Sequence, residues 1–548
     1  MALNPSAIGH STVEVIDGTI SEYYNIMDQC IRRSEVMPGQ YVSITSPSYS
    51  NNCPIDERSF TTVDVGCPAP KVVDVNNSFI TAKFKVPIKF PAGFKVNTNA
   101  CTFFVGWRSS IDALERYIIY CNHKTVYDQT FVGEESYILQ SIIPDHIKSK
   151  KKRQYTTYRN ASTFSPDVCG TYITLISPDT SVSDKKPKDL GAFTVNVEIP
   201  IKIDVSQFLL FSNFKYLPAF CGTWSIKLYP STRNMILCPV DPTVMMTSVQ
   251  FNKFRAFDLA QYTHNFVQKG DKIKCITGID ENAPVQPTFA DVTIEIGSAK
   301  MDEVLLHQTQ FELMYDIYDG LKSRYMARPL TIPVNKLDYG RFAGAMKNSG
   351  VSSTYTAAIQ NCESMFILPF TDDDHHTVCF NPKFTDLYLN ISGYGNFPQQ
   401  PFDTFGDNDK HTRFMNMTLD ALNINNSPLM GPNEDLLNSL ENRTIHTFVY
   451  NGAQTETDNN RNVDGSNFLI GIPFSNDIDF EGGLTSNGNI NFKLAARSSI
   501  IETLANQLNG GTSSLGATVM FVKDAALMIK VVPYATEPEC RLIEERIV

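Results

Sequence analysis

The sequence has few tryptophans, few charged residues and no long hydrophobic run. Two of its 548 residues are Trp, and Asp, Glu, Lys and Arg together make up 19%. It contains no stretch of about 18 apolar residues, and its first residues do not form the apolar segment of a secretory signal. We therefore expect a chain that is made in the cytosol, is not secreted through a signal peptide and does not span a membrane.

Motifs for catalysis and nucleotide binding are also missing. The sequence has no GxSxG nucleophile elbow, no GxxxxGK[ST] phosphate loop and no GxGxxG after a strand. The densest group of metal-ligand types, Asp372–His376, is contiguous, so its side chains would alternate between faces of a strand or be solvated in a loop. The solvated loop is the favoured interpretation. The sequence predicts a protein that is not an enzyme and has no catalytic residue, cofactor or metal site.

The balance of charge excludes a general affinity for nucleic acid. The net charge is −11, and a polyanion repels an acidic surface. One basic run, Lys148–Arg153, is an exception and would suit a nuclear-import signal or a phosphate contact. A solvated loop between strands is the simpler and favoured interpretation. Direct nucleic-acid binding is not expected.

The cysteines are numerous but form no pattern. All 12 are scattered singly, without a CxxC pair, so zinc-finger spacing is missing and a disulfide framework is not expected in a reducing compartment. We expect them to be buried thiols.

One stretch, Gly191–Val240, organises the rest of the chain. Apolar and polar residues alternate from Phe193 to Asp204, which predicts a half-buried strand, interrupted at Pro200 because proline cannot donate to a central ladder. A short apolar bridge follows, and the alternation resumes at Trp224. This order predicts half of a two-sheet sandwich. We expect Trp224, and likewise Trp107, to lie in a core.

A later stretch, Ser466–Ala495, repeats this order of parts: an apolar strand, a turn region rich in Gly, Ser and Asn, and a second alternating strand. At 548 residues the chain is also too long for one ordinary core. The 30 Gly and 30 Pro supply the turns that an all-β protein requires. We predict two β-sandwiches in tandem.

Shorter segments complete the prediction. Strands are expected by alternation at residues 80–86, Cys101–Trp107, Tyr117–Cys121 with Thr125–Tyr127, Phe289–Gly297, Lys383–Ile391, Arg413–Asn423 and Val519–Val532. Helices are expected at Ser21–Arg33, Ser110–Tyr117, Lys300–Gln308 and in the charged tail Glu537–Val548. Long insertions are expected at 141–190, 392–412 and 425–465, the last with a mobile loop in TETDNNRNVDG.

These segments resemble a known family. FFVGWRSSIDALERYIIYCNHKTVYDQT and IPIKIDVSQFLLFSNFKYLPAFCGTWSIKLYP are similar to parts of the double jelly-roll major capsid proteins of polinton-type and virophage-type (adintovirus-like) DNA viruses. ADVTIEIGSAKMDEVLLHQTQFELM resembles the segment that closes the first jelly roll in that lineage. IPFSNDIDFEGGLTSNGNINFKLA and VMFVKDAALMIKV resemble late elements of the second.

The resemblance implies an all-β fold of two tandem eight-stranded jelly rolls with short helices and long loops. It implies a structural protein whose trimers form pseudo-hexameric capsomers of an icosahedral double-stranded DNA virus shell. The expected partners are copies of itself in the trimer and in neighbouring capsomers, and penton or minor capsid proteins. The expected location is the virion, after synthesis in the host cytoplasm, and nuclear assembly is left open. The insertions would form towers and clasps between subunits.

The resemblance and the composition together suggest four parts: an N-terminal arm (1–60), a first jelly roll (61–320), a second (321–535) and a C-terminal tail (536–548). The arm would tie neighbouring subunits together, or else pack on its own domain. A carbohydrate-binding or carbohydrate-active jelly roll is the alternative function. Such a protein would line a concave sheet with aromatic and acidic residues and bind glycans as a monomer. A minor capsid or spike subunit is a third alternative, disfavoured because it often has a single jelly roll.

Overall fold

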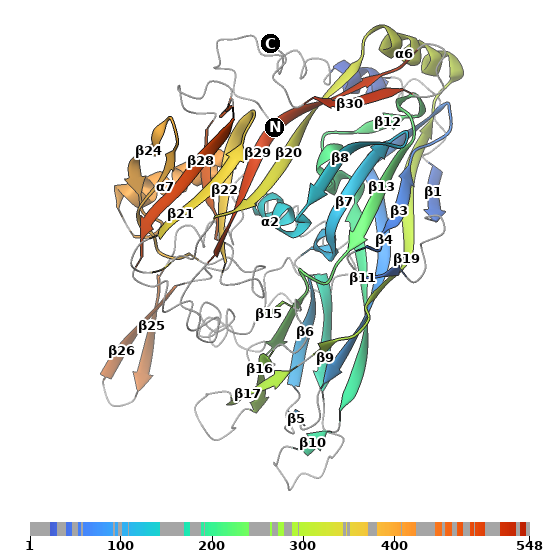
Figure 1. Ribbon diagram of the computed structural model, residues 1–548. Helices are drawn as coiled ribbons and strands as arrows, with labels where there is room; N and C mark the ends of the chain where they lie inside the picture. Colours follow the sequence, from blue (N-terminus) through green and yellow to red (C-terminus); the bar gives the residue numbers. More distant parts are fainter. Residues whose placement is uncertain are drawn as a thin grey trace.

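The computed structural model is built almost entirely of antiparallel β-sheet (Figure 1). The structure describes residues 22–29, 40–45, 53–55, 58–90, 94–96, 101–107, 109–142, 169–175, 188–190, 192–240, 264–265, 272–278, 288–293, 295–342, 347, 351–370, 381–406, 408–422, 444–451, 455–462, 468–474, 483–486, 488–498, 516–532 and 538–543.

The first sandwich contains two main sheets. One has the strand order β1 (Gln40–Thr45), β19 (Lys300–Glu312), β4 (Lys71–Phe90), β11 (Phe193–Asp204), with the short strands β2 (Cys53–Pro54), β12 (Tyr216–Pro218) and β18 (Glu295–Ile296) added to it. The other has the order β3 (Thr61–Val65), β13 (Trp224–Pro230), β7 (Leu114–Cys121), β8 (Lys124–Thr130). A third sheet, β15 (His264–Asn265), β14 (Ile236–Val240), β6 (Cys101–Trp107), β9 (Cys169–Leu175), continues the sandwich toward one end.

The second sandwich follows the same plan. Its first sheet has the order β20 (Leu330–Arg341), β29 (Gly516–Lys530), β22 (Cys362–Phe370), β27 (Ile470–Pro473), with β30 (Glu539–Ile543) added to β29. Its second sheet has the order β21 (Val351–Ala358), β28 (Asn489–Arg497), β23 (Thr385–Ile391), β24 (Gly395–Phe402). Apart from the consecutive pairs β7–β8, β23–β24 and β29–β30, the neighbouring strands of these main sheets are distant in sequence, so the chain crosses repeatedly between sheets, as in a jelly roll. The predicted tandem all-β architecture is confirmed.

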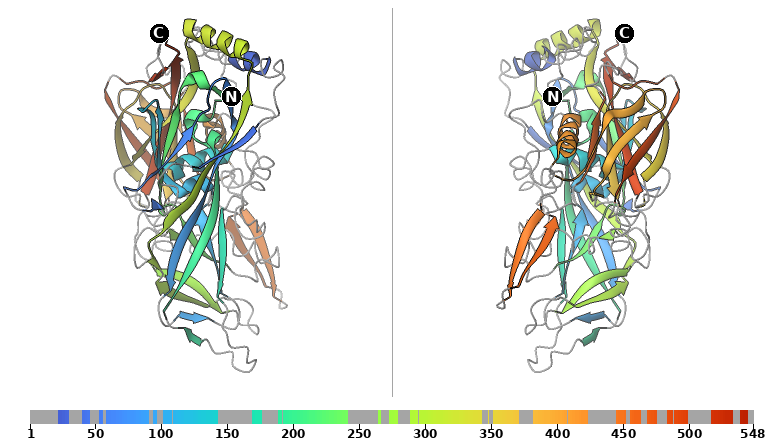
Figure 2. Two further views of the ribbon diagram at one scale, coloured as in Figure 1. Left: turned by 90° about the vertical axis from the view of Figure 1, so that its right-hand side faces the viewer. Right: turned by 90° about the vertical axis from the view of Figure 1, so that its left-hand side faces the viewer.

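Three two-stranded ribbons extend toward one end of the molecule (Figures 1 and 2). They are β5 (Phe94–Val96) with β10 (Lys188–Leu190), β16 (Lys272–Gly278) with β17 (Thr288–Thr293), and β25 (Thr444–Asn451) with β26 (Thr455–Asn462). The opposite end carries the helix α6 (Tyr315–Ala327) and a helix over residues 22–29. The helix α2 (Val132–Ile142) lies between the two sandwiches, and α7 (Asp409–Ala421) packs against the second.

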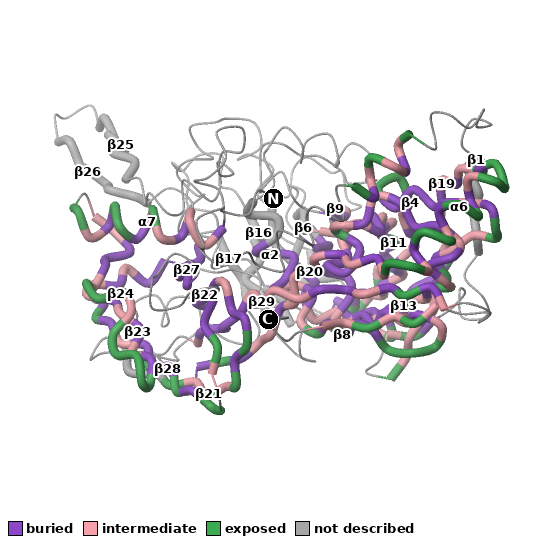
Figure 3. The backbone as a smooth tube through the Cα atoms, turned by 90° about the horizontal axis from the view of Figure 1, so that it is seen from above, coloured by how far each residue is buried: buried purple, intermediate pink, exposed green. Residues whose placement is uncertain are grey.

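Each sandwich has its own buried interior, and Figure 3 shows the two interiors side by side. In β4 the burial alternates residue by residue from Ile80 to Phe90, so one face of the strand is covered by the opposing sheet. Phe84 meets Trp107 edge to face, with ring centroids 4.9 Å apart. In the second sandwich Phe521 of β29 packs on Phe492 of β28 at 5.3 Å. Trp107 and Trp224 are both fully buried, as predicted.

Several sequence predictions are confirmed in position and type. The strand at Cys101–Trp107 is β6, and the hairpin around CNHK is β7 and β8, with Asn122 and His123 at positive φ in its turn. The expected strand at Val519–Val532 is β29, a single continuous strand.

Pro200 does not interrupt β11, contrary to the prediction. The strand runs from Phe193 to Asp204, and Pro200 stands opposite Lys83 of β4. The strand lies at the edge of its sheet, with β4 as its neighbour. The Pro200 carbonyl accepts from Cys169 Sγ at 3.9 Å, so the hydrogen-bonding side of this residue faces away from β4 and the missing proline N–H leaves no ladder bond unmade.

Two predicted helices are strands. Lys300–Gln308 belongs to β19, where Gln308 and Gln310 occupy inward positions and Gln310 Nε2 donates to Gln308 Oε1 at 3.0 Å. Because polar residues occupy part of the buried face, the sequence of this strand does not show the alternation of apolar and polar residues that predicts a strand. Of Ser110–Tyr117, only Ser110–Ala113 forms one 3₁₀ turn, and the remainder begins β7 because it pairs with β13 and β8.

The predicted strand Arg413–Asn423 is wrong, because residues 413–421 belong to the helix α7. Asn408 caps this helix by accepting a hydrogen bond from the His411 N–H at 2.9 Å. The buried residues His411, Phe414 and Thr418 follow helical spacing. Gly471 of β27 allows the helix to approach, because a Cβ there would lie 2.8 Å from the Cβ of Ala421. The alternating Met and Leu residues on which the prediction rested are only partly buried.

Three segments expected as loops or helix are strands. β24 (Gly395–Phe402) lies in the predicted loop 392–412, and β26 (Thr455–Asn462) lies in the stretch expected to be a mobile loop. Within the tail, Glu539–Ile543 forms β30 instead of a helix, because it pairs with the end of β29. The basic run at 148–153 and the cluster Asp372–His376 lie outside the described residues.

Candidate functional site

The described residues contain no group of three or more His, Cys, Asp or Glu side chains placed to hold a metal ion. Across the same part of the chain, no helix is long and apolar enough to cross a membrane. The candidate site is the junction between the two sandwiches. It consists of β20, α2 and β30, together with the residues that they contact in the first sandwich.

Strand β20 forms the first part of the junction. It is the edge strand of its sheet, so its outer carbonyl groups need partners other than a strand. Side chains of the first sandwich supply them. Asn213 Nδ2 donates to the Pro333 carbonyl at 2.7 Å, and the Tyr127 hydroxyl donates to the Asn335 carbonyl at 3.1 Å. The edge is thereby covered within the same chain.

The second part of the junction surrounds the start of α2. The ring of Phe131 stacks on Tyr339 of β20, with centroids 3.7 Å apart and planes 18° from parallel. The Arg233 guanidinium lies over the same Phe131 ring, 4.9 Å from its centre. Glu134 stands 3.9 Å from Arg233. Aromatic stacking and a cation over a ring fix the relative position of the two sandwiches more tightly than apolar contact alone.

The third part is the C-terminal strand β30, which extends a sheet of the second sandwich and reaches the hairpin turn of the first. Asn122 Nδ2 donates to the Pro538 carbonyl at 3.0 Å, and Asn122 Oδ1 accepts from the Thr223 N–H at 3.0 Å. The sulfur atoms of Cys121 and Cys540 lie 2.7 Å apart.

The helix over residues 22–29 packs on its own chain. Tyr23 is fully buried and its hydroxyl donates to the Tyr216 carbonyl at 2.9 Å. Tyr23 also meets Tyr325 of α6 edge to face at 5.5 Å, and Lys215 pairs with Asp28 at 2.8 Å. Of the two alternatives for the N-terminal segment, these contacts favour packing on its own domain for this part of it.

A buried carboxyl group lies behind the junction in the first sandwich. Glu135 of α2 is 1% exposed and accepts a hydrogen bond from the Tyr117 hydroxyl at 3.2 Å. Burial raises the pKa of Glu135 to about 8, and the nearby Asp112 adds to the effect, while the Tyr117 hydrogen bond opposes it. Glu135 is therefore largely protonated at neutral pH.

A pair of acidic residues lies in the second sandwich, where Glu363 and Asp524 are hydrogen-bonded to each other. Burial raises the pKa of both carboxyl groups, and the neighbouring Asp524 raises that of Glu363 further. Two partly buried carboxyl groups in contact are held by a shared proton.

Exposed apolar side chains mark the surface at two places. Met314 and Tyr315, at the start of α6, are 53% and 66% exposed, and Tyr394 in the turn between β23 and β24 is 49% exposed. Aromatic residues and methionine are enriched where proteins bind each other.

None of the junction residues was singled out by sequence reasoning, because their partners are far apart in the chain. The one local signal was the Asn122-His123 turn.

The junction hydrogen bond of Tyr127 provides a direct test of this arrangement. Tyr127→Phe removes the hydroxyl and leaves the Asn335 carbonyl without that donor, so we expect a loss of about 1 kcal/mol of unfolding free energy. Chemical denaturation measures it. The exposed Tyr315→Phe serves as the control and should change nothing measurable. Equal stability of both variants would contradict a role for this bond.

No family model and no curated protein match the chain. Solved structures of viral capsids do. The structure of the Sputnik virophage is similar over 93% of this chain and 89% of its own, with a TM-score of 0.48 and 13% identity. The mavirus major capsid protein is similar over 89% and 88%, with a TM-score of 0.42 and 13% identity. For the PBCV-1 virus capsid the shares are 93% and 97%, with a TM-score of 0.37 and 8% identity. The assignment of the fold rests on the strand order described above.

Proposed function

We propose that the chain is a major capsid protein whose trimers form the pseudo-hexameric capsomers of an icosahedral double-stranded DNA virus shell. The observation that carries the proposal is the pairing of two sandwiches of one design in a single chain. Three copies around a threefold axis would present six similar units, and a closed heterologous ring is the symmetry that brings them together. Such a ring has a nearly hexagonal outline and can tile a facet.

The junction supports this proposal because a subunit that packs into a capsid facet must hold its two sandwiches in a fixed relative position. The two sandwiches are connected by hydrogen bonds to an edge strand, by an aromatic stack and by the strand β30. The exposed apolar side chains Met314, Tyr315 and Tyr394 are suitable anchors for contacts between copies. The three ribbons at one end would form the towers of the capsomer.

The same proposal includes the domain boundaries, the partners and the location of the protein. Residues 61–320 and 321–535 would be the two jelly rolls, with 1–60 as the N-terminal arm and 536–548 as the tail. The protein would be made in the host cytoplasm, assemble with itself and with penton or minor capsid proteins, and reside in the virion. It would act without catalytic residues, consistent with a shell subunit.

Electron microscopy of the purified, concentrated protein tests the proposal. We expect threefold particles in negative stain, and hexagonal sheets or closed shells at high concentration. Dispersed single chains that bind glycans would overturn the proposal and favour the carbohydrate-binding alternative.

A further inference from the structure

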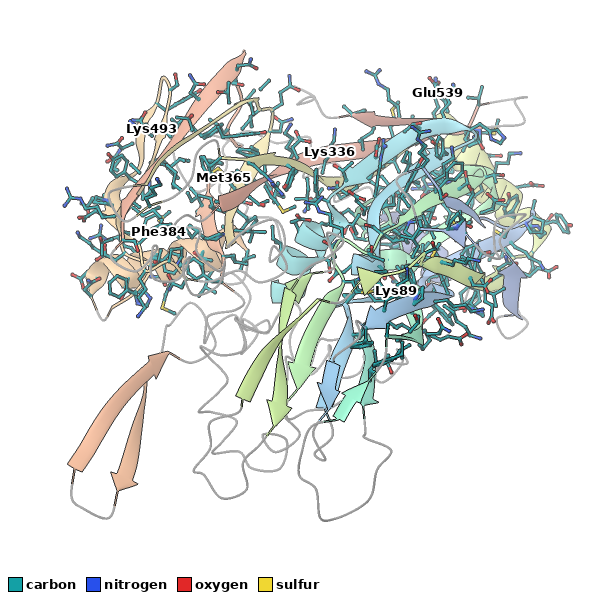
Figure 4. The ribbon with its side chains drawn as sticks, turned by 60° about the horizontal axis from the view of Figure 1, so that its bottom comes forward. Lys89, Lys336, Met365, Phe384, Lys493 and Glu539 are labelled. Atoms are coloured by element: carbon teal, nitrogen blue, oxygen red, sulfur yellow. The ribbon has the colours of Figure 1, made fainter. Side chains whose placement is uncertain are left out.

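The C-terminal strand connects the two halves of the chain. β30 pairs with β29 in the second sandwich, from Lys530 opposite Glu539 to Ala526 opposite Ile543. It runs over the first sandwich in Figure 1, and Figure 4 places Glu539 above that sandwich, while Met365 and Lys493 lie in the second. A bond from β30 to the first sandwich would therefore lock the junction.

Two thiols meet where β30 touches the first sandwich. The Sγ atoms of Cys121, the last residue of β7, and Cys540 lie 2.7 Å apart, close to the roughly 2.05 Å of a disulfide bond. Cys121 is 1% exposed, whereas Cys540 is partly exposed. Cys540 is therefore the more accessible residue of the pair. The seven cysteines whose side chains the structure describes are all present as thiols.

The backbone on both sides of this pair is already held in place. The Asn122 side chain, next to Cys121, donates to the carbonyl of Pro538, two residues before Cys540. Gly222 makes this approach possible, since a Cβ there would lie 2.8 Å from Pro538 Cγ and 2.8 Å from Asn122 Oδ1, and its φ is +89°. Closing the sulfur–sulfur distance thus requires only a small displacement.

A third thiol lies nearby but is poorly suited to compete. Cys221 is 1% exposed, and its carbonyl oxygen, not its sulfur, lies 3.9 Å from Cys121 Sγ. Burial raises the pKa of the Cys221 thiol well above its usual value. Cys121 is equally buried, so the feature that favours it over Cys221 is the 2.7 Å distance of its sulfur from that of Cys540.

We propose that Cys121 and Cys540 form a reversible disulfide that fastens the C-terminal strand of the second sandwich to the first, with a low-molecular-weight disulfide such as oxidised glutathione as the oxidant. The Cys540 thiolate attacks the oxidant and displaces one glutathione thiol. Cys121 then attacks the Cys540 sulfur and displaces the second. Two protein S–H bonds are lost and one S–S bond forms. The two electrons and two protons appear in two glutathione thiols.

The bond would act as a switch between compartments. In a reducing compartment the pair remains dithiol, and in an oxidising one it closes. The joined residues are 419 positions apart, so closure restricts the unfolded chain over most of its length. The proposal concerns a single chain and does not depend on what that chain assembles into.

The test uses the full-length protein, equilibrated in a series of reduced and oxidised glutathione mixtures and then blocked with N-ethylmaleimide. Non-reducing digestion and mass spectrometry should identify a linked peptide containing Cys121 and Cys540, which dithiothreitol removes. The oxidised protein should melt roughly 3–6 °C above the reduced form.

Cys540→Ser should abolish both the linked peptide and the oxidant-dependent shift in melting. It is the preferred variant because Cys540 is partly exposed, so its replacement opens no buried cavity. Cys67→Ser, at another partly exposed cysteine, is the matched control and should retain both effects. The proposal is overturned if folded protein forms no Cys121–Cys540 link in the most oxidising mixture, if links to Cys67 or Cys221 form equally, or if the linked protein melts like the reduced one.

Discussion

Trp224→Ala is expected to reduce the unfolding free energy by about 3–5 kcal/mol, the range for a large aromatic residue removed from a core. Trp224 is fully buried at the start of β13. Its ring meets Phe211 at 5.7 Å and Phe214 at 6.1 Å, both edge to face, and its Nε1 donates to the Cys221 carbonyl at 3.1 Å. Alanine would lose these contacts and leave a cavity between the two sheets.

The neighbouring residue supplies the control for this prediction. Ser225 is only partly buried and lies on the opposite face of the same strand, so Ser225→Ala should change stability by less than about 0.5 kcal/mol. Chemical denaturation of both variants gives the comparison. Unchanged stability of Trp224→Ala would show that β13 is not packed against the opposing sheet as described.

Glu135→Gln is expected to stabilise the protein at alkaline pH. In the folded chain the pKa of Glu135 is raised from its usual 4.5 to about 8. Between these values the folded state binds a proton that the unfolded state lacks, so unfolding free energy falls as pH rises from about 4.5 to about 8. Glutamine stays neutral and can still accept the Tyr117 hydrogen bond.

The variant and the parent should therefore be about equally stable near pH 4.5 and differ by on the order of 4 kcal/mol near pH 8. Denaturation curves across this range measure the difference. Glu312→Gln, at an exposed glutamate at the end of β19, should follow the parent at every pH. A constant difference between Glu135→Gln and the parent would contradict the protonated state of Glu135.

The all-β fold class and strands such as β4, β6, β11 and β29 could be predicted because they depend on local alternation. The failures share a physical cause, which is that tertiary contacts decided the structure. Gln308 and Gln310 are hydrogen-bonded to each other inside the sandwich, so the inward face of β19 is apolar at Val304 and Leu306 but polar beyond them. Pro200 is tolerated because its strand is at a sheet edge, which the sequence of that strand does not reveal.

The junction could not be predicted for the same reason. Tyr127 and Asn335 are 208 positions apart, and Cys121 and Cys540 are 419 apart. No local sequence pattern indicates that residues so far apart in the chain are in contact. The expectation that the cysteines are buried thiols holds for Cys121, which is buried, whereas its neighbour Cys540 is partly exposed on a strand that the sequence suggested was a helix.

The solution mass of the purified full-length protein tests the central claim most directly. If the paired sandwiches exist to contact copies of the same chain, light scattering after size-exclusion chromatography should give one stable species at three times the chain mass of 61.3 kDa. A single species at 61.3 kDa that persists as the protein concentration rises would contradict the account.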